Sequence, residues 1–168
     1  MRLNLRDIIH QPGASVPFSF RLELSGLDFF GSRPFAHPVE VSGQVRNQAG
    51  ALVLEGEAHT TLEVVCDRCL KPFSEELVLP VEHLLAETLE DEENDDILLL
   101  DGGELDLEEV FTTDLVLAME PKHVCSEECK GLCPKCGANL NDGPCQCRAE
   151  VDPRFAVLAQ LLDKESDD

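Results

Sequence analysis

Hydrophobic and polar residues alternate along much of the first half of the chain. Apolar residues at every second position are typical of a strand with one buried face. A first alternating run comprises Phe18, Phe20, Leu22 and Leu24. Further runs follow at residues 39–45, 52–64 and 73–85, and Asn47 to Gly50 forms a turn between the first two of these. Successive strands joined by short turns indicate an antiparallel β meander or a partial barrel.

Helical spacing begins later, after a short apolar run at residues 97–100 that predicts one more strand. Asp106-Leu-Glu-Glu109 resembles a capping box, whose side chains satisfy backbone N–H groups at a helix N-terminus. Pro121 ends this predicted helix. Its apolar residues at near-helical spacing are Leu107, Val110, Phe111, Leu115 and Met119.

The C-terminus predicts another helix, because Asp152-Pro153 combines an N-cap residue with proline at the first helical position. Its apolar stripe comprises Phe155, Leu158, Ala159 and Leu162. Residues 28–38 contain glycine and proline and predict a loop, in which we expect no functional role for His37. The predicted fold class is α+β, with a few helices beside the β-rich region.

Eight cysteines occur in close pairs, and this spacing suggests metal binding. Six lie between Cys125 and Cys147, and Cys66-Asp-Arg-Cys69 falls at the tip between two predicted strands. Thiolate is a preferred zinc ligand, and cysteines separated by two residues can bind one ion. We predict one or two structural zinc ions, held by Cys66, Cys69, Cys125, Cys129, Cys133, Cys136, Cys145 and Cys147.

The close pairs can form two four-cysteine sites in three ways. Cys133-Pro-Lys-Cys136-Gly137 has the form of a zinc-ribbon knuckle, in which glycine supplies backbone freedom. Its nearest partner is the pair Cys145 and Cys147, which leaves the other two pairs to share an ion. We favour this pairing, but the spacing leaves the other two open. His123 can also replace one cysteine as a ligand.

Two other roles for the cysteines are less consistent with the sequence. Disulfides are typical of small secreted proteins, but residues 1–13 lack the apolar core and cleavage site of a signal peptide. Inert buried cysteine does not explain a paired pattern beside glycine and proline. We therefore expect a cytoplasmic protein with reduced thiols, and no apolar run is long enough to span a membrane.

The chain is strongly acidic, with 34 Asp and Glu against 13 Lys and Arg and a formal net charge of −21. Residues 74–120 hold 17 of these acids and no Lys or Arg. The densest part, residues 87–96, can be a solvated loop or a docking surface for a basic partner. Chelation of a hard cation is less consistent with the sequence, because EF-hand spacing is absent.

Several function classes lack support. Four cysteines can fill every position around zinc, and the sequence has neither a catalytic zinc motif nor a nucleophile motif. The region from Pro121 to Arg154 holds five basic and five acidic residues, and the chain has no Trp or Tyr for base stacking. We expect no DNA partner and no tight RNA binding. A local RNA contact through the cysteine-rich module stays open, and so does the role of Arg68.

Three parts are predicted from these observations. Residues 1–120 form a β-rich body with an acidic loop and one helix, and residues 121–150 form a zinc-ribbon-like cysteine-rich module. Residues 151–168 form a C-terminal helix that packs on the body.

Several of these motifs together resemble a known family. Cys66-Asp-Arg-Cys69-Leu-Lys-Pro-Phe73, the acidic middle and Phe155-Ala-Val-Leu-Ala159 resemble the YceD family of bacteria and plastids. Gly131-Leu-Cys-Pro-Lys-Cys-Gly-Ala-Asn-Leu-Asn141 is similar to the cysteine-rich form of that family. The resemblance implies a non-enzymatic role in ribosome biogenesis, which supports accumulation of the large-subunit ribosomal RNA. We expect a basic ribosomal protein or a precursor particle as partner, and a metal-dependent RNA hydrolase or nuclease as the alternative.

Overall fold

The structure is a computed structural model, and it describes residues 1–88 and 97–147. The described residues divide into two compact units. The body unit contains residues 1–67 and 71–125, and the cysteine-rich unit contains residues 68–70 and the described residues from 126 onward. The predicted acidic segment at 87–96 lies outside the described residues from residue 89 onward, and so does the predicted helix at 151–168. The predicted division at residues 120 and 150 stays a prediction.

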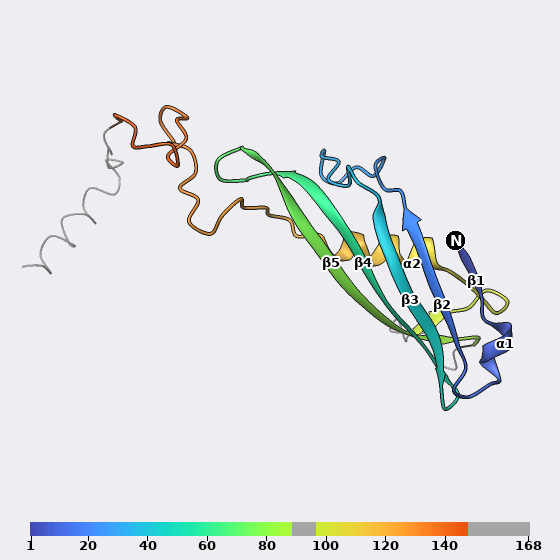
Figure 1. The fold of residues 1–168 in the computed structure, drawn as a ribbon. Helices are drawn as coiled ribbons and strands as arrows, with labels where there is room; N and C mark the ends of the chain where they lie inside the picture. The colour runs from blue at the N-terminus through green and yellow to red at the C-terminus, as the bar shows by residue number, and fades with distance from the viewer. Residues whose placement is uncertain (89–96, 148–168) are drawn as a thin grey trace, which may run out of the picture. The chain divides into compact units, whose positions relative to one another are not determined.

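The described residues of the body unit form seven strands and two helices (Figure 1). In chain order these are β1 (Arg2–Asn4), α1 (Arg6–Ile9), β2 (Ser15–Leu22), β3 (Val39–Gln48), β4 (Ala51–Val65), β5 (Pro72–Ala86), β6 (Ile97–Leu99), β7 (Glu104–Asp106) and α2 (Leu107–Ala118). None of the helices in the described part of the chain is long and apolar enough to cross a membrane.

The main sheet has the strand order β2-β3-β4-β5-β6, and β1 pairs with β7 in a separate two-stranded ribbon. The predicted antiparallel meander is confirmed from β2 to β5. The predicted strand at residues 97–100 is confirmed as β6, and it pairs parallel to β5 with Leu84 opposite Ile97. The alternation of residues shows which face is buried but carries no information on strand direction. In the described residues the sheet is open rather than barrel-like, because β2 and β6 each have one neighbour.

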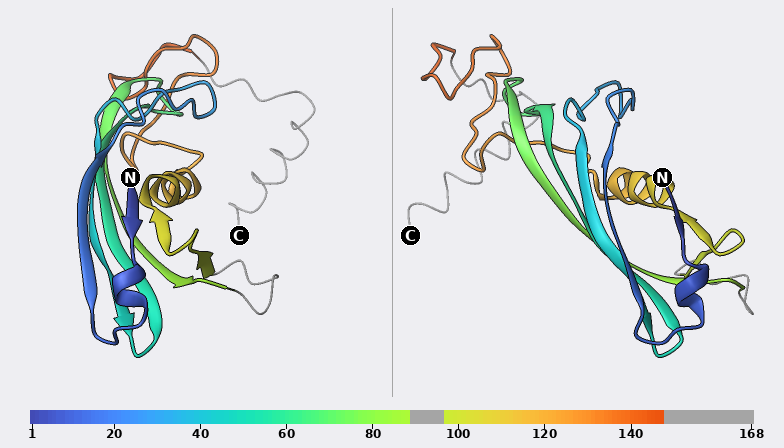
Figure 2. Two further views of the ribbon diagram at one scale, coloured as in Figure 1. Left: turned by 90° about the vertical axis from the view of Figure 1, so that its right-hand side faces the viewer. Right: turned by 45° about the vertical axis from the view of Figure 1, so that its right-hand side comes forward.

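Helix α2 covers the concave face of this sheet (Figure 2). Phe111 is fully buried, and its ring lies 5.9 Å from the ring of Phe18 and 6.1 Å from that of Phe20. Close approach is possible because Gly43 and Gly56 are cross-strand partners beneath these rings. A Cβ atom at Gly56 would lie only 2.9 Å from Phe111 Cζ. The two glycines therefore make room for the aromatic cluster of the core.

The predicted helix is confirmed as α2, and its N-cap is the predicted residue. The Asp106 side chain accepts a hydrogen bond from the Glu108 N–H at 3.1 Å. The helix ends at Ala118, before Pro121, because proline disfavours helical geometry in the residue that precedes it. The chain then enters the segment that carries six cysteines.

Asn47 fixes the turn between β3 and β4 and attaches α1 to it. Its side chain is buried, and Nδ2 donates to the carbonyl oxygens of Ile8 and Ile9 at 2.7 and 2.8 Å. Its Oδ1 accepts from the Gly50 N–H at 2.8 Å. Ala49 and Gly50 both have positive φ, 55° and 103°, as expected for the tight turn of a hairpin. The buried Asn47 amide thus hydrogen-bonds to α1 through its nitrogen and to the β3–β4 turn through its oxygen.

Candidate metal centres

The eight cysteines form two groups of four in the structure. The first group is Cys66, Cys69, Cys125 and Cys129, and the second is Cys133, Cys136, Cys145 and Cys147. Within each group the sulfur atoms all lie within 4.8 Å of one another. These groups are the same as the pairing that the sequence favours.

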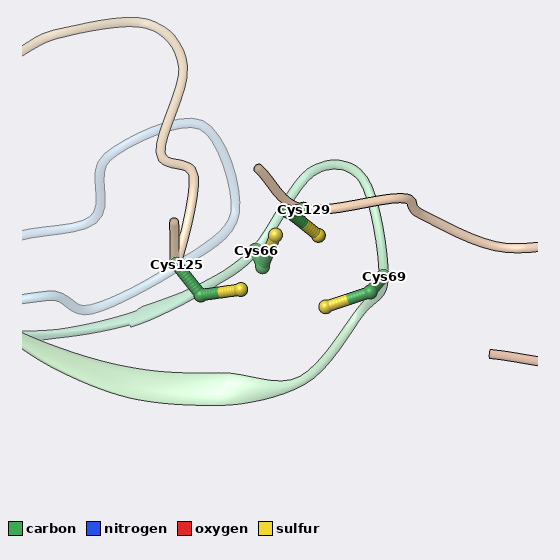
Figure 3. Close-up of side chains that lie close together, drawn as sticks. All are labelled: Cys66, Cys69, Cys125 and Cys129. Carbon is green, nitrogen blue, oxygen red and sulfur yellow. The ribbon is translucent and has the colours of Figure 1, made fainter. Parts of the chain in front are cut away.

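The first group gathers cysteines from two distant parts of the chain (Figure 3). Cys66 follows β4 and Cys69 lies in the turn before β5, whereas Cys125 and Cys129 follow α2. The four sulfurs surround a common centre, and Cys66, Cys69 and Cys129 are buried. In a tetrahedral four-thiolate zinc site with Zn–S bonds of about 2.3 Å, the sulfurs lie roughly 3.8 Å apart. The donor set and its spacing therefore fit a zinc ion.

Hydrogen bonds within the body unit join the backbone next to Cys66 to the backbone just before Cys125, two cysteines of the first group. The Asp67 N–H donates to the His123 carbonyl at 2.9 Å, and the His123 N–H donates to the Asp67 carboxylate at 2.8 Å. The His123 ring pairs through Nδ1 with Glu75 at 2.9 Å. In the described residues, both groups of candidate ligands contain only cysteines. The His123 ring therefore lies outside the ligand set and instead supports the backbone next to the first group through its contact with Glu75.

Arg68 braces the cysteine-rich unit. Its guanidinium donates to the carbonyl oxygens of Glu127 and Cys129 at 3.0 and 3.1 Å. The Arg68 carbonyl accepts from the Leu132 N–H at 3.0 Å. Gly131, at φ 72°, passes so close that an added Cβ would lie 3.0 Å from this carbonyl oxygen. Both ends of Arg68 therefore contact the segment that carries Cys129 and Cys133.

The second group is built on a knuckle from Cys133 to Gly137. The Gly137 N–H donates to the Cys133 carbonyl at 2.9 Å. Gly137 has φ 71°, a positive value that glycine adopts more readily than other residues. The backbone N–H groups of Cys136 and Lys135, together with the Cys145 side chain, lower the pKa of Cys133 to about 6. This knuckle therefore stabilises a thiolate, the form of cysteine that binds metal.

Cys147, the last cysteine of the second group, has a raised pKa instead of a lowered one. The neighbouring Cys136 sulfur, burial and the Cys133 sulfur together raise the pKa of Cys147 to about 12. Several thiolates at this distance repel one another, so they cannot all ionise without a compensating positive charge. A divalent cation supplies that charge and replaces the thiol protons. The group is therefore suited to a metal ion.

Three side chains that arrange these groups have no assigned role in the sequence. The sequence leaves Arg68 open between an RNA contact and a brace of its own knuckle, and the pairing of Asp67 with His123 carries no motif. Asn141, whose amide contacts the Cys129 sulfur at 3.4 Å, lies in a polar loop that the sequence presents only as a spacer. Short spacing identifies ligands, whereas the residues that position them depend on the folded backbone.

The model of the YceD family, described as large ribosomal RNA subunit accumulation protein YceD, matches residues 54–162. An uncharacterized protein of Mycobacterium tuberculosis is 27% identical over 167 residues, which covers 97% of this chain and 75% of the relative.

Two plant relatives have more informative names. The large ribosomal RNA subunit accumulation protein YCED homolog 1, chloroplastic, of Arabidopsis thaliana is 28% identical, with coverage of 78% of this chain and 50% of the relative. The homologue of that name in Zea mays is 28% identical, with coverage of 88% and 61%. No solved structure matches the chain.

Proposed function

The chain belongs to the YceD family, and from this premise we propose that it is a non-enzymatic ribosome-biogenesis factor. Its role is to support accumulation of the large-subunit ribosomal RNA by binding a basic ribosomal protein or a precursor particle. Family membership carries this proposal, because the family description names accumulation of that RNA. The plant relatives carry the same description in their names.

The charge of the chain supports a basic partner. A formal net charge of −21 repels nucleic acid phosphates over the surface as a whole and attracts cationic proteins. Ribosomal proteins that contact RNA are typically rich in Lys and Arg, because backbone phosphates dominate RNA affinity. An acidic factor can therefore shield such a protein, or hold it until RNA replaces the factor.

One cavity of the body unit is lined by both acidic and apolar side chains. A cavity of about 310 Å³ lies where α2 faces β6 and β7, and Leu98, Leu105 and Val110 contribute to its lining. The acidic residues that line it are Asp101, Glu104, Asp106, Glu109 and Asp114. Arg2 is the only Lys or Arg in that lining, and it lies 3.8 Å from Asp106. This arrangement suits a basic segment that also carries an apolar side chain.

We also propose that the eight cysteines bind two structural zinc ions. Each group supplies four thiolates, so no position is left for a catalytic water. Zinc would neutralise part of the thiolate charge and hold the cysteine-rich unit together. Recognition is then left to the body unit and to local contacts of the cysteine-rich unit with RNA. The same role places the protein where large subunits assemble, which is the cytoplasm in a bacterium.

Affinity purification with a salt titration tests the partner. We expect a large-subunit precursor or a basic ribosomal protein to copurify at low salt and to dissociate as salt screens the charges. The triple variant Asp101→Asn, Glu104→Gln, Glu109→Gln should weaken this capture. It spares Asp106 and Asp114, because Asp106 caps α2 and Asp114 pairs with His83 at 2.8 Å.

A matched control neutralises three acids elsewhere on the body unit: Glu23→Gln, Glu57→Gln, Glu82→Gln. All three are exposed and lie outside the cavity. Equal loss of capture in both triple variants would place recognition in the overall charge rather than in this surface. Absence of any large-subunit component at low salt would contradict the binding proposal. Metal-dependent turnover of RNA would instead support the alternative, a hydrolase or nuclease.

A further inference from the structure

The loop between the Cys133–Cys136 knuckle and Cys145 contacts a cysteine of the other group. Asn141 Nδ2 lies 3.4 Å from Cys129 Sγ, and its Oδ1 accepts from the Lys130 N–H at 2.8 Å. One side chain thus holds both the sulfur of Cys129 and the backbone of the next residue. All three residues belong to the cysteine-rich unit.

Asn141 is fixed in this position by its own loop. Asn139 Oδ1 accepts from the Asn141 backbone N–H at 3.0 Å and from Nδ2 at 2.8 Å. The Leu140 N–H donates to the Gly131 carbonyl at 2.9 Å, which ties the loop to the segment after Cys129. The orientation of the amide therefore depends on the conformation of residues 137–142.

That conformation depends in turn on the second cysteine group. The loop connects Cys136 to Cys145, two proposed ligands of one ion, and it contains few apolar side chains. A metal ion at Cys133, Cys136, Cys145 and Cys147 closes the loop, whereas loss of the ion releases one end. Hydrogen bonds to a ligating sulfur stabilise its thiolate, and loss of such an outer partner typically lowers metal affinity about 10–100-fold.

We propose that Asn141 couples the two cysteine groups, so that metal bound to the second group raises the metal affinity of the first. Thermodynamic linkage requires the reverse effect by the same factor. The inference rests on the metal binding proposed above. It is independent of the ribosomal partner.

Residue-specific protection of cysteines tests the coupling. Each variant is equilibrated at a series of buffered free zinc concentrations and alkylated, and peptide mass spectrometry reports the protection of each cysteine. Protection of Cys125, the one cysteine of the first group that is not buried, then reports the first group, and that of exposed Cys136 reports the second. Circular dichroism of the sheet checks that the body unit stays folded.

The informative variant is Asn141→Asp, which keeps the oxygen that accepts from Lys130 but replaces the amide donor with an anionic oxygen. We expect the zinc concentration for half protection of the first group to rise about 10–100-fold. The matched control is Asn139→Asp, which adds the same charge to the same loop and keeps the acceptor for Asn141. We expect a change of less than about threefold in that control, because the donor to sulfur remains.

A double variant, Cys145→Ser with Cys147→Ser, disables the second group. It should weaken the first group by a factor similar to that of Asn141→Asp, and adding Asn141→Asp to it should cause little further loss. Two ions that bind independently, or equal effects of Asn141→Asp and Asn139→Asp, would overturn the coupling alone. A chain that binds no zinc would instead overturn the metal proposal on which it rests.

Discussion

The two units of the chain differ in what fills their interiors. The body unit buries a continuous set of aliphatic and aromatic side chains, with Phe111, Leu54 and Val45 fully covered. In the described part of the cysteine-rich unit, the buried apolar residues are Cys69, Cys129 and Cys133. One unit therefore has a hydrocarbon core, and the other has a core of sulfur.

This difference implies two sources of stability. Apolar burial contributes about 25 cal/mol per Å² and can support the body unit on its own. The cysteine-rich unit buries too little apolar surface to offset the entropy of ordering its chain. In such modules, metal binding provides the folding free energy. Metal removal and truncation of the hydrocarbon core should therefore affect different units.

Removal of zinc should affect the two units unequally. Structural zinc in small modules binds with apparent free energies of about 10–16 kcal/mol, so a strong chelator should unfold the cysteine-rich unit. Hydrogen exchange should become fast in residues 126–147 and stay slow in β3 and β4. Protection of residues 126–147 that survives metal removal would contradict the comparison, and so would collapse of the whole sheet.

Truncation of the aromatic core should destabilise the body unit and leave metal binding by the cysteine-rich unit unchanged. Phe111→Ala removes the ring that packs on Phe18 and Phe20, and such changes typically cost about 3–5 kcal/mol. Urea unfolding should show this loss while zinc content stays unchanged. Leu117→Ala is the control on the same helix, because Leu117 is 78% exposed, and it should change stability by less than about 0.5 kcal/mol.

The glycine pair beneath the aromatic cluster should tolerate no side chain. In Gly43→Ala the new Cβ would lie 2.6 Å from Gly56 Cα and 2.7 Å from Phe18 Cζ. We expect a loss of about 1–3 kcal/mol from overpacking. Gly26→Ala is the control, since nothing lies within 4 Å of the added atom. Equal urea midpoints for the two variants would show that the sheet adapts to the added methyl group.

Arg68→Ala should have the smallest effect on stability, and it should show whether Arg68 braces the cysteine-rich unit or contacts a partner. Loss of its two carbonyl contacts should cost about 1 kcal/mol, or roughly fivefold in zinc affinity of the first group. Exposed Arg33 provides the control variant Arg33→Ala. If Arg68→Ala left zinc affinity unchanged but weakened binding of a large-subunit precursor, Arg68 would be a contact residue rather than a brace.

Much of the body unit was predictable because one sheet face is buried. Alternation identified β2 to β5, and the capping sequence identified the start of α2 at Asp106. The short elements β1, α1 and β7 were missed, since three or four residues are too few to show a period. The parallel pairing of β6 was also missed, because pairing partners are set by tertiary packing.

In the cysteine-rich unit, the sequence identified candidate ligands but not their supports. Close pairs restrict the possible groups to a few, and the preferred grouping matches the arrangement of the sulfurs. Asn141 and Arg68 act through contacts that depend on loop geometry, and neither has a sequence signal of its own. Metal occupancy itself stays a prediction.

The most direct test of a sulfur core is the number of metal ions in the full-length chain, measured by native mass spectrometry after purification without added metal. We predict two zinc ions per chain, and one in the variant Cys145→Ser with Cys147→Ser. A folded chain without metal, or one with its cysteines joined in disulfides, would contradict the account.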